Sequence, residues 1–470
     1  MDFSKIIEQH EQSDFYKWAK WGDDYFKGDN TAIKERKKQC YLGGLMEDPY
    51  KANHRLGSLY NRILVKQLVN YLLGNGIQFK SDADIIPLQD TLGKKFNKLT
   101  RQCSETAGKL GLSWVQPYIE KGELKFKQIP SMQIVPIWNE YDHDDLDAVI
   151  RFYGVSKTVK NKEIELRRIE YWTDTDVTYY IETNKESNKY ILDTSYETNP
   201  QPHYKLIDIV NNNVISTRGI AWGKVPFIPL WWNDEKQNQL YTIKQWIDIY
   251  DITCSDFANN IDDFQDVYWI LKNYGGQNLD EFMNEIKRLK TIKVGGDGEA
   301  SAQTIQIPTE ARSTFLKLCN DAIYKFGQGV DTSAVGDGNI TNVVIRSRYA
   351  DLDLKANEFE TQLDEWFEGV LYFVNEWHKL KGLQQYADIS LIFDRSMIIN
   401  ELEVMDAVSK QKGIVSDVTM LENHPLVENV DIELERLEAQ AQANPIKLDD
   451  AGVEDIDNDE EAEKINEENE

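Results

Sequence analysis

The sequence predicts an α+β protein, mainly helical, in which a domain of short antiparallel strands is followed by long amphipathic helices. Between residues 114 and 192, short segments of alternating polar and apolar residues are separated by turns of hairpin length. Between residues 349 and 380, apolar residues return every three or four positions without a miss, as on one face of an α-helix. The two periodicities lie in different parts of the chain, so sheet and long helices are expected to be sequential.

The first part of the chain divides into an N-terminal helical arm, 1–39, and an α+β domain, 40–237. The arm mixes aromatic residues with both signs of charge and has a turn at Gly28, Asp29 and Asn30 before a short basic helix. The two prolines near the end of the domain exclude a helix there. In the domain we expect helices at 52–73 and 90–111, a hairpin at 114–129, and strands at 134–138, 148–153, 164–173, 176–182, 189–192 and 214–216.

A first helical stripe of apolar residues begins at Leu240 and predicts a helix over 238–264. Its other faces carry several carboxylates against the single cation Lys244, so we expect one anionic face in contact with solvent. A small α/β insertion, 265–308, and a returning helix, 309–327, follow. In the insertion we expect strands at 266–271, 291–294 and 303–307 and a helix at 279–290. The carboxylates of the anionic face are Asp248, Asp251, Asp256, Asp262 and Asp263.

The segment 328–346 is rich in Gly, Asp and Asn, which is typical of turns. The long stripe then predicts one continuous helix from about Asn342 to Lys381, ~60 Å long at 1.5 Å per residue. The stripe must be buried against helices of the same chain or of identical copies, while polar residues, Lys355 among them, occupy the outer faces.

The C-terminal part of the chain follows in three pieces. The long helix and its connection take up 347–394, and 395–445 form a compact helical piece. Asn400, with Glu403 three residues later, predicts a capping box at the start of its first helix. We expect a disordered acidic tail at 446–470, because residues 449–470 contain twelve acidic residues and one basic residue.

Composition excludes several classes of function. With 53 basic and 80 acidic residues, a net charge of −27 disfavours a protein that reads nucleic-acid sequence. No apolar run is long enough for a membrane span, and the first twenty residues lack the apolar core of a signal peptide. The four cysteines form no CxxC pair, and no phosphate-binding loop or HExxH motif occurs. We therefore expect no metal, no cofactor and no enzymatic activity.

The order of these parts resembles the portal (connector) proteins of tailed bacteriophages, in the siphophage-type Gp6-like family. The resemblance covers residues 40 to 445. Its local marks are the segment 53–62 with 74–77, the segment 224–230 before the first long helix, and Gly338-Asn339 leading into 349–357.

The resemblance implies a homo-oligomeric ring, usually of twelve subunits, at one capsid vertex of the virion, assembled in the host cytoplasm. Double-stranded DNA would enter through it during packaging and leave at infection. The portal fold would comprise a wing (40–237), a stem (238–264 and 309–327), a clip (265–308), the long wing helix, and a crown (395–445). The tunnel loop, 328–346, would include Gly336, Asp337, Gly338, Asn339, Ile340, Thr341, Asn342 and Arg346.

The resemblance also implies protein partners, and no membrane. The clip would bind the terminase large subunit and later the head-completion adaptor, and the major capsid and scaffold proteins would contact other parts. The candidate clip residues are Tyr268, Trp269, Asn273, Tyr274, Lys287 and Arg288.

In such a ring, the stem carboxylates would line the channel and repel phosphate, so that DNA slides without sticking. Lys325, Arg346 and Arg348 flank the loop and are equally compatible with phosphate contacts or with salt bridges. Two other classes remain open. One is an acidic carbohydrate-active enzyme whose Trp231 and Trp232 stack on sugar; the other is an acidic scaffold or DNA-mimic protein, which needs no ring.

Overall fold

The structure is a computed structural model that divides into two compact units. The first contains residues 1–337 and 346–397, the second 338–345 and 398–470, and each is described by itself. The described residues are 1–36, 52–159, 162–183, 189–210, 213–263, 268–272, 299–303, 308–334, 341–396, 401–411, 413–422, 424–427 and 429–443.

The N-terminal arm folds into helices, as predicted. Ser13 caps the second helix by accepting the N–H of Tyr16 at 3.2 Å, and Gly28 ends it with a left-handed φ of 85°. The predicted helix 90–111 is split at Gly93, whose φ is 74°. The helices before the sheets are α1 (Phe3–Glu11), α2 (Asp14–Lys27), α3 (Thr31–Lys34), α4 (Tyr60–Leu73), α5 (Ile86–Leu92) and α6 (Phe96–Leu110).

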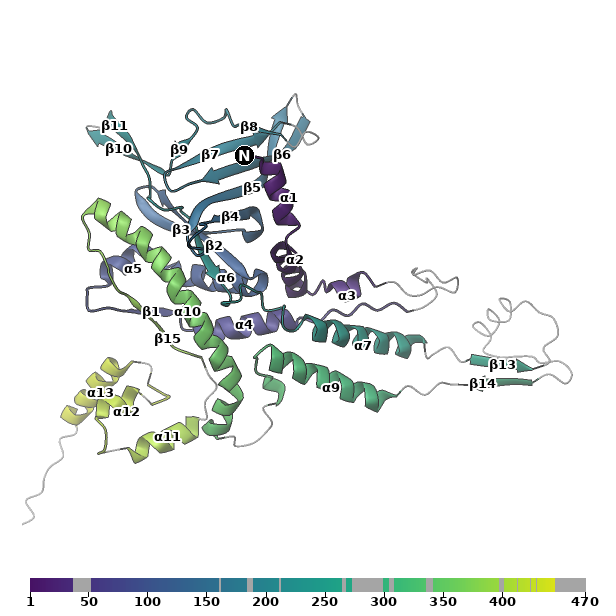
Figure 1. Cartoon of the computed structure of the whole chain (residues 1–470). Helices are drawn as coiled ribbons and strands as arrows, with labels where there is room; N and C mark the ends of the chain where they lie inside the picture. The colour runs from purple at the N-terminus through teal and green to yellow at the C-terminus, as the bar shows by residue number, and fades with distance from the viewer. Residues whose placement is uncertain are drawn as a thin grey trace, which may run out of the picture. The chain divides into compact units, whose positions relative to one another are not determined.

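The two largest sheets among the described residues of the first unit are both antiparallel (Figure 1). Since neighbouring residues of a strand point to opposite faces, Ile150 packs on α1 while Val149 packs toward the smaller sheet. The larger sheet has the order β4 (Ile134–Trp138), β5 (Leu146–Val159), β6 (Lys162–Trp172), β7 (Asp176–Glu182), β8 (Tyr190–Leu192), and β9 (Gln201–Pro202) pairs with β7. The smaller has the order β12 (Ile228–Trp231), β2 (Leu112–Glu120), β3 (Glu123–Ile129).

The predicted hairpin and strands are confirmed. The structure also contains two strand pairings that the sequence did not predict. The β2–β3 turn uses Lys121 and Gly122, both at positive φ, as a tight hairpin requires. β10 (Tyr204–Val210), which the sequence analysis missed, pairs with β11 (Asn213–Ile220). β1 (Ile77–Lys80) pairs with β15 (Ser390–Phe393), so residues about three hundred positions apart share one small sheet.

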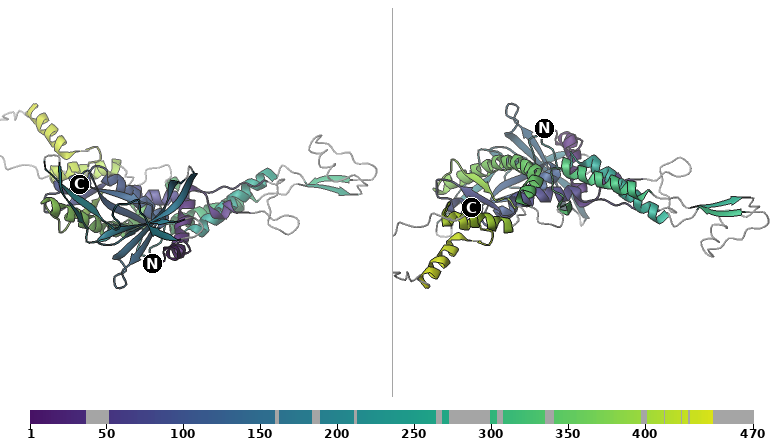
Figure 2. Two further views of the ribbon diagram at one scale, coloured as in Figure 1. Left: turned by 90° about the horizontal axis from the view of Figure 1, so that it is seen from above. Right: turned by 90° about the horizontal axis from the view of Figure 1, so that it is seen from below.

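Helices α7 (Lys244–Asp263) and α9 (Thr309–Phe326) lie side by side and extend away from the sheets of the first unit (Figures 1 and 2). Residues 239–243 form turns before α7, so this helix starts later than the apolar stripe predicts. Beyond the helix pair, β13 (Tyr268–Lys272) pairs with β14 (Glu299–Gln303). Of the strand expected at 303–307, only Gln303 lies among the described residues, and it ends β14. The helix expected at 279–290 lies outside the described residues.

Helix α10 (Asn342–Lys381) confirms the predicted long helix, with its bounds. Its stripe is buried by the same chain: Trp366 stacks on Phe96 with ring centroids 5.7 Å apart, and Trp232 contacts Phe359. The stripe therefore does not require identical copies for its burial. Lys355, expected on an outer face, is buried, and the prediction for this residue is wrong.

The second unit is helical, as predicted. The backbone N–H of Asn342 donates to Glu403 at 2.6 Å. Asn400, expected to cap the first of these helices, and the tail 446–470 lie outside the described residues. The helices are α11 (Glu401–Lys410), α12 (Asp417–Glu422) and α13 (Val430–Ala443). Among all described helices, none has the length and hydropathy needed to cross a membrane.

Candidate functional site

The polar face of α7 binds the extended segment that precedes α4. Side chains one helical turn apart on α7 accept the backbone N–H groups of every second residue in this segment, which runs antiparallel to the helix. The bonds are His54 N–H to Asn259 Oδ1 (2.6 Å), Leu56 N–H to Ser255 Oγ (3.0 Å) and Ser58 N–H to Asp251 Oδ1 (3.0 Å).

The two spacings match. Alternate N–H groups of an extended chain point the same way and repeat every ~6.6 Å, while side chains four positions apart on a helix repeat every ~6 Å. Gly57 allows the segment to lie close to the end of α2, because a Cβ there would lie 2.3 Å from the carbonyl oxygen of Gly28. Residues 52–59 are therefore not helical, contrary to the predicted helix 52–73, since α7 takes N–H groups that a helix would use internally.

The N-terminal arm binds the same face of α7. Asp248 accepts hydrogen bonds from the Tyr25 hydroxyl and from Lys244, the latter at 2.7 Å. Arg36 pairs with Asp256 at 2.9 Å. The arm and the segment 54–58 together cover much of the helix face that the sequence suggested would be open to solvent.

Asp251 contradicts the prediction of a solvated anionic face. Its side chain is fully buried, accepts hydrogen bonds from Asn30 as well as from Ser58, and has a pKa raised by burial. Asp262 is about half exposed and pairs with the His54 imidazole. The side chain of Asp263 lies outside the described residues. Asp248, Asp251, Asp256 and Asp262 thus all have partners in their own chain.

The start of α7, the end of α9 and the middle of α10 meet at Lys355. Its ammonium donates to the carbonyl oxygen of Gly327 at 2.7 Å and to Gln239, and lies 5.6 Å from the centre of the Trp232 ring. Gly327 caps α9, so this cation satisfies a carbonyl at a helix C-terminus. Burial lowers the pKa of Lys355 to about 7. The helix pair is therefore tied to the long helix by a fully buried amine.

A second contact fixes the same junction. Gln67 of α4 donates to the carbonyl of Val330 at 2.8 Å and accepts its N–H at 2.9 Å. A Cβ at Gly329 would lie 2.2 Å from Leu64, so only glycine fits between α4 and the segment after α9. The root of the α7–α9 pair is thus held on α4 and α10.

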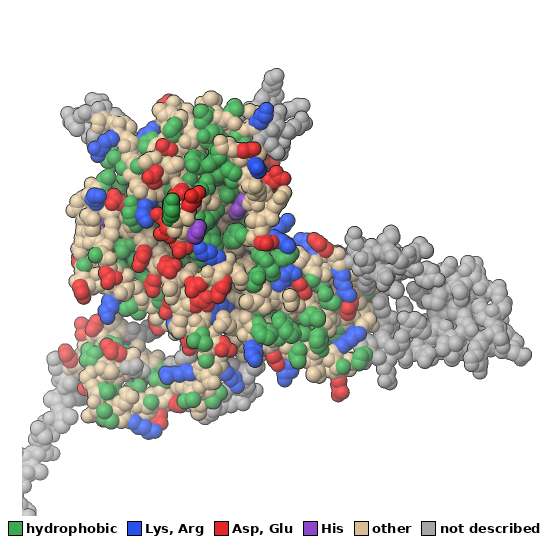
Figure 3. All heavy atoms as spheres, viewed as in Figure 1, with side chains coloured by type: hydrophobic (Ala, Val, Ile, Leu, Met, Phe, Trp, Pro, Cys, Tyr) green, Lys and Arg blue, Asp and Glu red, His purple; other side chains and the backbone are tan. Residues whose placement is uncertain are grey.

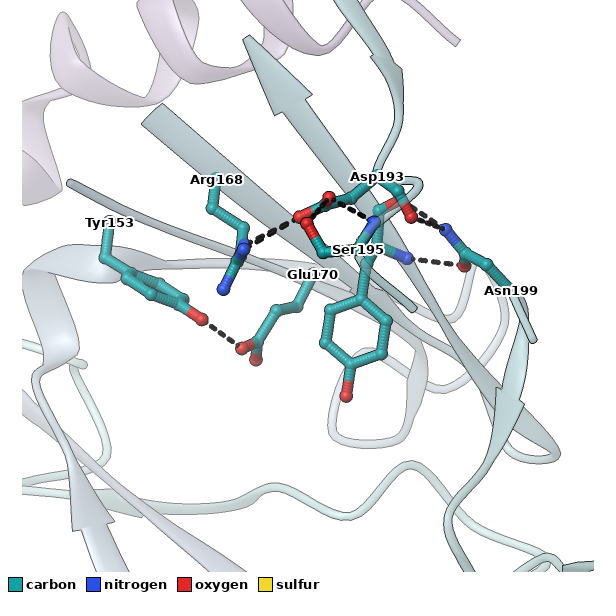
Figure 4. Close-up of polar contacts among 7 residues, drawn as sticks. Tyr153, Arg168, Glu170, Asp193, Ser195 and Asn199 are labelled. Atoms are coloured by element: carbon teal, nitrogen blue, oxygen red, sulfur yellow. Dashed lines mark hydrogen bonds and ion pairs between the residues drawn. The ribbon is translucent and has the colours of Figure 1, made fainter. Parts of the chain in front are cut away.

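Another polar cluster lies on one face of the larger sheet (Figure 4). Arg168 donates from Nε to the buried Asp193 at 3.0 Å, and Glu170 accepts from the Tyr153 hydroxyl at 2.7 Å. Burial acts to raise the pKa of Asp193, but hydrogen bonds from Ser195 and the charge of Arg168 outweigh it and lower the pKa. Because its carboxylates are matched within the sheet, we interpret this cluster as structural. The labelled residues are Tyr153, Arg168, Glu170, Asp193, Ser195 and Asn199.

The other candidate residues are only partly described. Of the loop residues, Gly336, Asp337, Gly338, Asn339 and Ile340 lie outside the described residues, Thr341 and Asn342 belong to the second unit, and Arg346 is an exposed residue of the first. Of the clip residues, Tyr268 and Trp269 belong to β13, while Asn273, Tyr274, Lys287 and Arg288 are not described. Trp232 is buried, which removes a sugar-stacking residue of the carbohydrate-enzyme alternative.

Comparison with known proteins decides the family. Residues 5–446 match the family described as "Phage portal protein, SPP1 Gp6-like". The chain belongs to this portal family. The portal protein of Bacillus phage SPP1 is 28% identical over 472 residues, covering 96% of this chain and 89% of the relative. The portal protein of Clostridium phage phiCD119 (strain Clostridium difficile/United States/Govind/2006) is 29% identical over 458 residues, covering 90% and 93%.

The family confirms the resemblance inferred from the sequence, and the chain functions as a phage portal protein. The sequence analysis missed the residues that organise this portal chain internally: Lys355, Gln67, Ser255 and Asn259. The sequence held one signal for Ser255 and Asn259. With Asp251 they repeat every four positions along a predicted helix, although Asp, Ser and Asn are poor helix formers whose side chains readily accept backbone hydrogen bonds.

Proposed function

We propose that copies of this portal chain assemble into a ring, usually of twelve, at one capsid vertex, and that double-stranded DNA passes through its centre during packaging and ejection. The α7–α9 pair would be the stem, β13 and β14 part of the clip, the α+β body with α10 the wing, and α11–α13 the crown. The role is structural and not catalytic.

The observation that supports a ring is the apolar surface of the α7–α9 pair. The two helices pack on each other through Ile247 and Ile323, yet large apolar side chains remain exposed on their outer faces, with Leu318 at 53% and Ile261 at 51%. Apolar side chains gathered on so small an element mark a protein contact. Identical helix pairs set side by side in a closed ring would cover them. The exposed apolar residues are Ile249, Ile261, Phe315, Leu318 and Phe326.

A single charge on this surface should block assembly. Leu318→Asp places a carboxylate where neighbouring helix pairs would meet, so we expect folded chains that no longer form rings, because an unpaired charge at a buried contact costs several kcal/mol. Light scattering after size exclusion, with negative-stain images, measures this. Ile207→Asp, at an equally exposed residue of β10, is the matched control and should leave rings intact. Loss of rings in both variants, or in neither, would contradict the role assigned to the helix pair.

The passage of DNA is the second part of the proposal. Asp256 and Asp262 keep exposed side chains, at 42% and 51%, and remain our candidates for a wall that repels phosphate. We expect Asp256→Asn with Asp262→Asn to slow packaging, measured as DNA per capsid over time, while rings form normally. An unchanged packaging rate would argue against a repulsive wall.

The proposed partners follow the same assignment. The terminase large subunit and then the head-completion adaptor would bind the clip, with Tyr268 and Trp269 of β13 as candidate contacts. The tunnel loop around Arg346 would lie next to the DNA. Major capsid and scaffold proteins would contact the assembled ring in the virion.

A further inference from the structure

A groove in the first unit lies between the α5–α6 connection, the tip of the β2–β3 hairpin and the C-terminal end of α10. It encloses about 1230 Å³. Its apolar lining includes Phe126 and Trp377, and its rim carries Lys94, Lys95 and Lys98, all exposed. We call this the basic groove. A lysine-rimmed, apolar-lined groove fits a partner surface that is both acidic and apolar.

The rim lysines are available for such a partner. In the part of the chain that the structure describes, Lys94, Lys95 and Lys98 form no ion pair, whereas Lys125 on the opposite wall pairs with Glu120 at 2.8 Å. The three lysines also flank the start of α6, where the helix dipole adds positive potential. The lining also holds the carboxylates Asp90, Glu120 and Glu123, of which the last two pair with Lys125, and a further lysine, Lys381. Lysines therefore outnumber carboxylates in this groove, although the chain as a whole has a net charge of −27.

The same unit carries a complementary surface on the exposed side of α10, which we call the acidic ridge: Asp364, Glu365 and Glu368. Figure 3 shows acidic side chains gathered over the middle of this helix. Burial raises the pKa of Asp364, and the neighbouring carboxylates of Glu360 and Glu368 raise it further. None of the three ridge residues has an ion-pair partner among the described residues. The ridge is therefore a set of carboxylates that repel one another and lack a matching cation.

Two further features shape the ridge. Leu354 lies on the same side of α10 and is 62% exposed, so the ridge also presents an apolar side chain. The charge of Lys236 acts on Glu365, but Lys236 pairs with Asp144. The ridge thus combines convex helical shape, negative charge and an exposed leucine.

We infer that the acidic ridge of one copy of this chain seats in the basic groove of the next copy. A separate acidic peptide in the groove would leave the ridge carboxylates uncompensated, whereas a contact between copies matches both surfaces at once. Because each chain offers one ridge and one groove, the contact is head-to-tail and repeats around a closed ring. The inference rests on the proposed ring and adds to it the wing surfaces through which neighbours meet.

Charge reversal tests the contact in the full-length chain. The groove variant is Lys94→Glu, Lys95→Glu, Lys98→Glu, and the ridge variant is Asp364→Lys, Glu365→Lys, Glu368→Lys. Like charges set face to face should raise the concentration needed for ring assembly more than about 100-fold in each variant. The substituted side chains are exposed, so circular dichroism should remain that of the unaltered protein.

Mixing the variants gives the decisive result. Groove-variant chains offer acidic grooves and acidic ridges, ridge-variant chains basic grooves and basic ridges, so a mixture should assemble into alternating rings. A chain with all six substitutions should assemble as well. The matched control for the groove variant, Lys5→Glu, Lys20→Glu, Lys205→Glu, carries the same charge change as that variant at exposed lysines elsewhere and should assemble like the unaltered protein.

The outcomes separate this inference from the proposed function. If the unaltered chain forms rings and the groove or ridge variant forms them at the same concentration, the ridge–groove contact is wrong but the proposed ring is not. Binding of an acidic peptide to the groove of such rings would then identify a different occupant. If both variants fail and the mixture also fails, the surfaces do not face each other. If the unaltered chain forms no ring, the proposed assembly and the contact are both wrong.

Discussion

Asp251→Ala is expected to lower the free energy of unfolding by about 3 kcal/mol. The substitution leaves two buried donors without an acceptor: the backbone N–H of Ser58, and one of the two amide hydrogens of Asn30, whose other hydrogen bond goes to the carbonyl oxygen of Ser58. The cost of burying the carboxylate itself, seen in its raised pKa, offsets part of this loss. The remaining penalty is that of two unsatisfied donors on the segments that α7 holds in place.

Urea titration followed by tryptophan fluorescence measures this change, with Asp256→Ala as the matched control on the same helix. Asp256 pairs with Arg36 at the surface, where an ion pair contributes less than about 1 kcal/mol. Equal losses for the two variants would show that Asp251 is not the anchor of the extended segment. In ring assays, Asp251→Ala should also assemble less well, because the arm and residues 54–58 would detach from the stem helix.

Much of the helical part of this fold could be predicted because its signals are local. Helix α10 spans about eleven turns at 3.6 residues per turn. It contains no proline and a single glycine, Gly369, so its bounds follow from the sequence alone. The β2–β3 hairpin is similar, since alternating residues flank a turn that contains Gly122. The signals for both elements come from residues close together in the sequence, so they do not depend on which distant residues pack against them.

The polar contacts of the site could not be predicted in this way. A carboxylate on the polar face of an amphipathic helix gives the same pattern whether water or a distant backbone N–H lies against it. Asp251 is bound by residues about two hundred positions earlier, and Lys355 reaches Gln239 more than a hundred positions away. Residues 52–59 carry a helical pattern, but the tertiary contact with α7 outweighs local propensity. The pairing of β1 with β15 is likewise invisible to local periodicity.

The second prediction with a large effect concerns Lys355 and pH. The pKa of its ammonium is about 7 in the folded chain, against 10.5 for an ordinary lysine. Between these two values the unfolded chain binds more protons than the folded chain, so stability rises with pH in this window. The free energy of unfolding should increase by about 2 kcal/mol from pH 7 to pH 9 through this single group. Below pH 7 both states are protonated and the effect levels off.

Lys355→Met isolates this contribution, because it keeps the length of the side chain and removes the titrating amine. The absolute stability of the variant combines the loss of the bonds to Gln239 and Gly327 with relief from burying an amine, so the slope against pH is the readout. Urea midpoints at pH 7, 8 and 9 should rise for the unaltered chain and for Lys379→Met, an exposed lysine of the same helix, but much less for Lys355→Met. A slope unchanged by Lys355→Met would mean that Lys355 is charged and solvated in the folded chain, and the junction of α7, α9 and α10 would then need another explanation.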